Sequence, residues 1–81
     1  MARIALSSSL APFTGGETAI ELDVANVRQL FAALGERYPE LASQLETALA
    51  VAIDGKIYQD ALLKTIAAES EVFVFPKIAG G

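Results

Sequence analysis

A single apolar stripe at helical spacing, set between segments that alternate apolar and polar residues, most constrains what this chain can fold into. Four apolar side chains recur at i, i+3, i+4 and i+7 on one helix face: Val27, Leu30, Phe31 and Leu34. Asn26 is a good N-cap for this helix, and Pro39 ends it near Tyr38. The sequence therefore predicts one main amphipathic helix that needs an apolar surface to pack against.

The segments on either side show the period-two alternation of β-strands. They cover residues 2–10, 18–24, 49–54, 56–60 and 71–75. The first two are joined by a loop that contains Gly15 and Gly16, and they form an N-terminal hairpin. Asp54-Gly55 is a strong signal for a tight turn between the third and fourth strands.

Two further segments are less regular. Residues 40–49 predict a short second helical piece that carries Leu41 and Leu45, whereas residues 61–70 have no clear period. The resulting order is strand, strand, helix, strand, short strand, strand. It predicts an α+β fold in two layers, with a mixed sheet of four to five strands on one main helix. This order fits the β-grasp, or ubiquitin-like, topology without excluding other small α+β arrangements. We expect one domain over residues 1–76 and a flexible tail over residues 77–81.

Composition narrows the classes of function. The 81-residue chain has no cysteine and no histidine, and its net charge is −4. It therefore lacks disulfides, thiolate–metal sites and the usual general base near neutral pH. An acidic chain is a poor ligand for phosphate backbones, and no apolar run reaches the roughly 18 residues of a membrane span. We expect a small cytoplasmic domain with no bound metal or cofactor, no nucleic-acid partner and no membrane partner.

The last predicted strand is apolar on both faces. Val72 and Val74 point to one side and Phe73 and Phe75 to the other, because side chains alternate along a strand. If the valines face the helix, the two rings stand on the outer face, where a partner would cover them. The alternative is a central strand that is buried on both sides. Since a two-layer domain of this size has one main helix to cover one face, partner contact is the favoured interpretation.

The chain closes with Gly80-Gly81, which allows two interpretations. One is a frayed tail or an expression scar. The other is that the terminal carboxylate is the working part, because glycines without Cβ atoms let a backbone thread a narrow channel and approach a nucleotide. Such a carboxylate would be the substrate of another enzyme, since this chain has no phosphate-binding loop and no His or Cys for covalent catalysis. Asp54, Asp60, Glu69 and Glu71 are interpreted as surface and turn residues that have no reason to converge.

Three stretches resemble one protein family. The C-terminal "EVFVFPKIAGG" resembles the ending of the MoaD/ThiS-type ubiquitin-like sulfur carriers, especially that of the molybdopterin synthase small subunit. "VRQLFAALGERYPEL" is similar to the family's first helix, and "VAIDGKIYQ" resembles its short strand and turn. The resemblance covers most of residues 26–81. The chain departs from the family at three places. Lys77 stands where a second proline is usual. The residues just before the last strand and the residues of the first strand also differ from the family pattern.

The resemblance implies a role for each residue of the C-terminal region. An E1-like adenylyltransferase would use ATP to adenylate Gly81, and a sulfur donor would convert the adenylate to a thiocarboxylate. Gly80 would give clearance in the partner's channel, and Ile78, Ala79 and Lys77 would lie in the same channel, with Ile78 and Ala79 as its contacts. Phe75 and Phe73 would be docking contacts. The charged carrier would insert its tail into the molybdopterin synthase large subunit, whose side chains perform the catalysis, so this chain is not an enzyme by itself.

Two other interpretations stay open. The same tail chemistry would serve a carrier for thiamine, cysteine, transfer-RNA thiolation or another metabolite. A ubiquitin-like interaction module whose tail is never activated also fits the departures from the family pattern.

Overall fold

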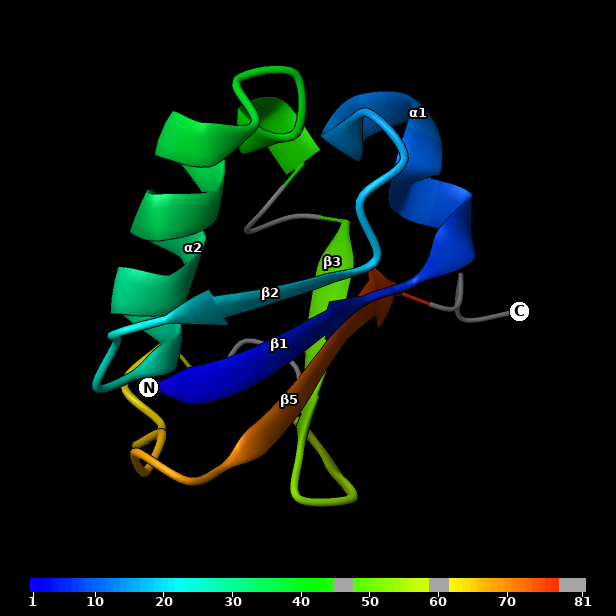
Figure 1. Ribbon diagram of the computed structural model, residues 1–81. Coiled ribbons are helices and arrows are strands. Elements are labelled where there is room, and N and C mark those ends of the chain that lie inside the picture. The colour runs from blue at the N-terminus through cyan, green and yellow to red at the C-terminus, as the bar shows by residue number, and fades with distance from the viewer. Residues whose placement is uncertain (45–47, 59–61, 78–81) are drawn as a thin grey trace.

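The computed structural model describes residues 1–44, 48–58 and 62–77, and within them the chain forms one five-stranded sheet and one main helix (Figure 1). The order across the sheet is β2-β1-β5-β3-β4. Its strands are β1 (Ala2–Leu6), β2 (Ala19–Leu22), β3 (Leu49–Ile53), β4 (Lys56–Tyr58) and β5 (Glu71–Pro76). β5 runs parallel to β1 and antiparallel to β3, and the outer pairs β1–β2 and β3–β4 are antiparallel. The predicted mixed sheet is confirmed, with β5 at its centre.

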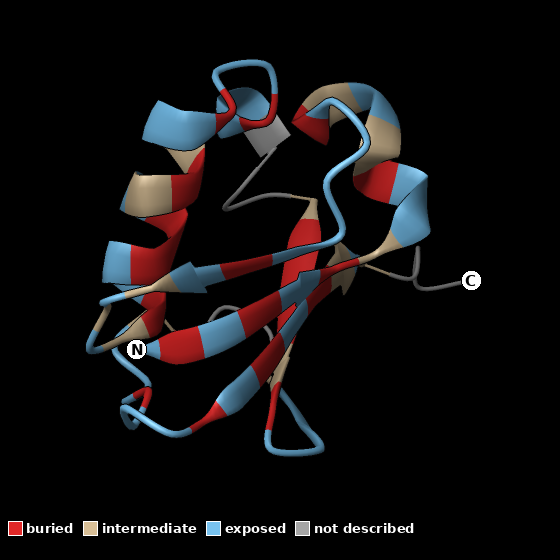
Figure 2. Cartoon of the chain, in the orientation of Figure 1, coloured by how far each residue is buried: buried red, intermediate tan, exposed pale blue. Residues whose placement is uncertain are grey.

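The helix α2 (Val27–Arg37) covers one face of the sheet (Figure 1). Its predicted stripe is confirmed, because Val27, Leu30, Phe31 and Leu34 are its buried residues. Strands β1 and β5 alternate buried and exposed residues along their length (Figure 2). The inward residues of the strands and the stripe of α2 belong to one hydrophobic core. Burial of this apolar surface is the main force that holds the two layers together.

The N-terminus of α2 is closed by side chains and by a distant segment. The side chain of Asn26 accepts a hydrogen bond from the Gln29 amide at 2.9 Å, as an N-cap does. The amides of the first two helical residues, Val27 and Arg28, donate to the carbonyls of Lys64 and Leu62, respectively. The irregular segment after β4 therefore completes the first helical turn, which no local pattern in it revealed.

The first predicted strand is shorter than expected. β1 ends at Leu6, and residues 8–14 form a 3₁₀ turn (Ser8–Leu10) followed by the short helix α1 (Ala11–Thr14). The prediction of a strand to residue 10 and a plain loop after it was wrong here. The Ser7 hydroxyl accepts the Ser9 amide and starts the turn, which carries Leu10 into the core. The loop glycines that follow do adopt positive φ, 66° at Gly15 and 88° at Gly16.

The other turn predictions hold. Asp54 and Gly55 have φ of 49° and 89°, which matches the tight β3–β4 turn that this dipeptide predicts. A 3₁₀ turn (Ala42–Gln44) confirms the short helical piece after α2, and Leu41 before it is buried. Leu45 lies outside the described residues.

Candidate functional site: the outer face of the sheet

The outer face of β5, opposite α2, carries the two phenylalanines. Val72 and Val74 point into the core, with exposed fractions of 2% and 0%, whereas Phe73 is 42% exposed and Phe75 is half-buried. The two rings stack, with centroids 5.4 Å apart and planes inclined by 20°. β5 is a central strand, but α2 covers only its inner face. The structure therefore confirms the predicted division of the strand into a core face and a ring-bearing face.

Small residues surround Phe73 on this face. Ala5 of β1 and Ala52 of β3 are its cross-strand neighbours, and Ala19 and Ile57 lie next to them on the edge strands. We call these five residues the apolar row. Since an alanine side chain ends at Cβ, the sheet surface stays low on both sides of the Phe73 ring. Ile57 is 64% exposed, so the row presents an apolar surface across the sheet.

A second row of residues, one pleat closer to the start of β5, is charged. Arg3 of β1 lies between Glu21 of β2 and Glu71 of β5 in the strand register. Asp54 follows β3 and reaches the start of β5. We call these four residues the charged row. An ion pair between Arg37 and Glu17 lies outside this row.

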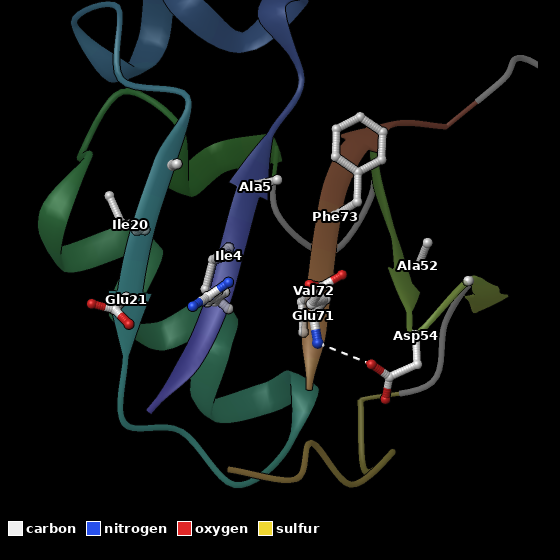
Figure 3. Close-up of a pocket in the computed structure, with 12 residues that line it drawn as sticks. Ile4, Ala5, Ile20, Glu21, Ala52, Asp54, Glu71, Val72 and Phe73 are labelled. Atoms are coloured by element: carbon white, nitrogen blue, oxygen red, sulfur yellow. Dashed lines mark hydrogen bonds between the residues drawn. The ribbon is translucent and has the colours of Figure 1, made fainter. Parts of the chain in front are cut away.

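The charged row and the apolar row, apart from Ile57, line an open hollow of about 720 Å³ (Figure 3). Phe73 stands at one end of the hollow, and Glu71 and Asp54 lie at the other, with Ala5 and Ala52 on either side (Figure 3). The hollow extends across to Ile20 and Glu21 of β2, so four elements contribute to its lining. It is an apolar depression with a charged border on one side.

Asp54 lines the hollow and is also fixed in place by hydrogen bonds to Ser70 and Glu71. Its Oδ1 accepts the Glu71 amide at 3.0 Å, and its Oδ2 accepts the Ser70 hydroxyl at 3.1 Å. Its own amide donates to the Glu71 carbonyl at 2.9 Å. Asp54 therefore ties the β3–β4 turn to the start of β5. Asp54 and Glu71 are an exposed turn residue and an exposed strand residue, as expected, but the β3–β5 pairing brings both to one border of the hollow, which the sequence analysis did not foresee.

The root of the tail follows the ring-bearing strand directly. Lys77 is half-buried, and its amide donates to the Ala48 carbonyl at 2.7 Å, one residue beyond the β3–β5 ladder. The predicted channel and attachment residues Ile78, Ala79, Gly80 and Gly81 lie outside the described residues. The tail therefore starts from the same strand that displays Phe73 and Phe75.

Among the described residues, the titratable groups with shifted pKa values lie in a separate cluster. The Tyr38 hydroxyl donates to Glu17 Oε1 at 2.6 Å, and Arg37 contacts both groups. The hydrogen bond from Tyr38, followed by that from Arg37, lowers the pKa of Glu17. Burial and the bond to Glu17 raise the pKa of Tyr38. The cluster fastens the loop before β2 to the end of α2 and has no role in the hollow.

No group of three or more acidic, His or Cys side chains in the described ranges is arranged to hold a metal ion. No helix there is long and apolar enough to cross a membrane.

The family model described as the ThiS family matches residues 4–81 of the chain. This chain belongs to the ThiS family. A search of curated proteins found no match. The fold of this ThiS-family chain is that of the ubiquitin-like β-grasp sulfur carriers, which is one of the α+β arrangements that the sequence allows.

Solved structures with this fold carry several names. A chain in the Amycolatopsis orientalis BexX/CysO complex superposes with a TM-score of 0.81, at 18% identity and full coverage of both chains. SAMP1 from Haloferax volcanii is 28% identical, with a TM-score of 0.72, over 99% of this chain and 98% of that one. A putative molybdopterin converting factor subunit 1 from Pyrococcus furiosus is 21% identical, with a TM-score of 0.63, over 95% and 97% of the two chains.

Sequence reasoning located the phenylalanines but missed the residues around them. The period-two rule places Phe73 and Phe75 on one face from the sequence alone. It does not reveal that Ala5, Ala52 and Arg3 share that face, because this depends on which strands are neighbours. The β-grasp strand order, with the first and last strands paired, was the available signal.

Proposed function

We propose that this ThiS-family chain carries sulfur on its C-terminal carboxylate in the cytoplasm. A carboxylate oxygen of Gly81 attacks the α-phosphorus of ATP in the active site of an E1-like adenylyltransferase, and pyrophosphate leaves. A hydrosulfide equivalent from a sulfur donor then attacks the carbonyl carbon of the acyl-adenylate, and AMP leaves. The product is a Gly81 thiocarboxylate, and this chain supplies no catalytic side chain to either step.

The observation that carries the proposal is the continuity of the tail with the ring-bearing strand. β5 displays Phe73 and Phe75 on a face that α2 leaves uncovered, and four residues after Lys77 the chain ends in Gly81. A partner that docks on the rings thereby fixes the point from which the tail departs. Lys77, Ile78 and Ala79 then occupy the partner's channel, and Gly80 gives the clearance that its active site needs.

The sulfur acceptor that we favour is a molybdopterin precursor. In this pathway the chain is the small subunit of molybdopterin synthase, and the large subunit accepts the tail and supplies the catalytic groups. The resemblance of "EVFVFPKIAGG" to that branch and the likeness to the molybdopterin converting factor subunit support this choice. Thiamine and cysteine pathways use the same tail chemistry, and the likeness to the CysO complex keeps the cysteine branch as an alternative.

ATP–pyrophosphate exchange tests the activation step. The chain is mixed with candidate E1-like enzymes, labelled pyrophosphate and ATP, and labelled ATP is counted. We expect exchange that depends on this chain. If none of the E1-like enzymes from the same genome supports exchange, while each activates its own established carrier, the proposal fails and the non-activated interaction module becomes the better account.

A second candidate function is covalent protein modification, which the 28% identity to SAMP1, a small archaeal modifier protein, favours. Here a lysine amine of a target attacks the same acyl-adenylate and AMP leaves, which forms an amide bond to Gly81. The two functions differ in their products. A modifier yields conjugates that resist reduction and denaturation, whereas a sulfur carrier yields the free chain with a thiocarboxylate.

A further inference from the structure

The hollow on the outer face differs in character from end to end, and this asymmetry bears on which partner fits it. At the Phe73 end its surface is apolar, because Ala5, Ala52 and the ring form it. At the other end are the carboxylates of Glu71 and Asp54 (Figure 3). An occupant that fills the whole hollow must therefore be apolar on one side and polar on the other.

The charged end is net negative. Its four side chains are Glu21, Arg3, Glu71 and Asp54, which is three carboxylates against one guanidinium. Arg3 stands on the β2 side of Glu71, so the excess of negative charge lies on the β3 side, at Glu71 and Asp54. Lys56 does not offset this charge, because it pairs with the inward residue Ile53 and so lies on the opposite face.

Both carboxylates retain the capacity to bind a cation. Asp54 accepts one hydrogen bond at each oxygen, and a carboxylate offers about four lone-pair positions. The bond between these two residues uses the Glu71 backbone amide, which leaves the Glu71 carboxylate exposed. Because the hollow is open, a side chain enters it without any rearrangement of the sheet.

We propose that the adenylating enzyme that accepts the tail carries an arginine or lysine next to an apolar side chain, as one recognition element for this hollow. The apolar side chain packs on Phe73 between Ala5 and Ala52, and the cation lies at Glu71 and Asp54. The proposal rests on the proposed function for the identity of the partner. Its content is the chemistry of recognition, in which the apolar contact supplies affinity and the carboxylates select among partners by charge.

The test is charge reversal at Glu71 with a matched control. The Glu71→Lys variant changes the exposed side chain and keeps the backbone amide that Asp54 holds. The Glu36→Lys variant makes the same change of net charge at an exposed position of α2, which covers the opposite face of the sheet. KM for the carrier is measured in the exchange reaction at low and at moderate salt. We expect Glu71→Lys to raise KM by about tenfold or more at low salt and by less at moderate salt, and Glu36→Lys to leave it within about twofold.

Equal KM values for the two variants would overturn the inference and leave the proposed function intact. If the wild-type chain supports no exchange, a second measurement still tests whether the hollow binds a cation next to an apolar side chain. Acetyl-leucyl-arginine amide is titrated into the isotope-labelled chain, with acetyl-leucyl-glutamate amide as the control ligand. We expect the arginine ligand alone to shift the amide signals of Phe73, Glu71 and Ala52, and to lose this effect with Glu71→Lys. Equal effects of both ligands, or no shifts at these positions, would refute the inference.

Discussion

Phe73 and Phe75 stack on the outer face of β5, with their ring centroids 5.4 Å apart. Phe73 is the more exposed of the two and stands at the end of the hollow, so its ring is available to a partner while Phe75 supports it. This pair links the sheet to the tail, because Lys77 follows Phe75 by two residues.

Replacing Phe73 with alanine should affect binding more than folding. The ring is partly exposed and its stacking contributes about 1 kcal/mol, so the free energy of unfolding should fall by about that amount. A central aromatic contact in an interface is commonly a hot spot, and we expect affinity for the adenylating enzyme to fall about 30-fold. Calorimetric binding and urea unfolding of the same sample measure both effects. A variant that unfolds readily but binds with unchanged affinity would remove Phe73 from the interface.

Phe75→Ala should also weaken binding, with a larger cost in stability. Its ring is half-buried, so we expect the free energy of unfolding to fall by about 2 kcal/mol. The folded fraction of this variant should also bind the adenylating enzyme with lower affinity than the wild type, which a loss of stability alone does not explain. A melting temperature well below that of Phe73→Ala together with wild-type affinity would assign Phe75 to the core alone.

Deleting Gly81 should abolish sulfur loading and leave the fold unchanged. The adenylating enzyme would meet Gly80 one residue short of its active site, whereas the hydrophobic core that the structure describes lies within residues 2–74. Circular dichroism and the melting temperature should match those of the full chain, and ATP–pyrophosphate exchange should disappear. An alanine in place of Gly81 is the matched variant, and it should slow exchange through its Cβ rather than through length.

The Tyr38–Glu17 bond should make stability depend on pH at both extremes. The folded-state pKa of Glu17 lies below its ordinary value of 4.5, so its contribution is present above pH 4.5 and lost as pH falls through the folded pKa. The pKa of Tyr38 is raised above 10.0, so the contribution of its protonated hydroxyl is present below pH 10.0 and lost as pH rises through the folded pKa.

Tyr38→Phe removes this hydrogen bond and the one that Arg37 Nε donates to the hydroxyl, and it leaves the ring in place. We expect a loss of about 1 kcal/mol at pH 7, measured by urea unfolding. The gap between variant and wild type should shrink as pH falls well below 4.5. A gap that stays constant from pH 7 to pH 3 would show that Glu17 does not couple to Tyr38 in solution.

Asp54→Ala should destabilise the protein because two hydrogen bonds are lost and alanine is strained at a φ of 49°. We expect a cost of about 2 kcal/mol. Asp54→Gly relieves the backbone strain but not the lost bonds, so it should be intermediate. If all three proteins unfold at the same urea concentration, Asp54 does not tie the turn to β5.

The sequence predicted the parts of this fold that depend on local pattern. The stripe from Val27 to Leu34, the Asn26 cap and the Asp54-Gly55 turn each follow from the residues within one or two turns of chain. The end of β1 at Leu6 did not, because Ala2–Leu10 alternates well enough for a longer strand and the serine turn competes with it. The residues of the candidate site also differ in whether local pattern predicts them. Phe73 and Phe75 follow from alternation, while the meeting of Glu71 with Asp54 depends on a pairing between distant strands.

Intact-protein mass spectrometry measures directly whether Gly81 carries sulfur. The chain is isolated from cells that supply the E1-like enzyme and a sulfur source, beside an established carrier that loads under the same conditions. We expect a species heavier by the exchange of one oxygen for sulfur, and fragmentation that assigns the change to Gly81. An unmodified chain, in a sample where the established carrier is loaded, would contradict this expectation.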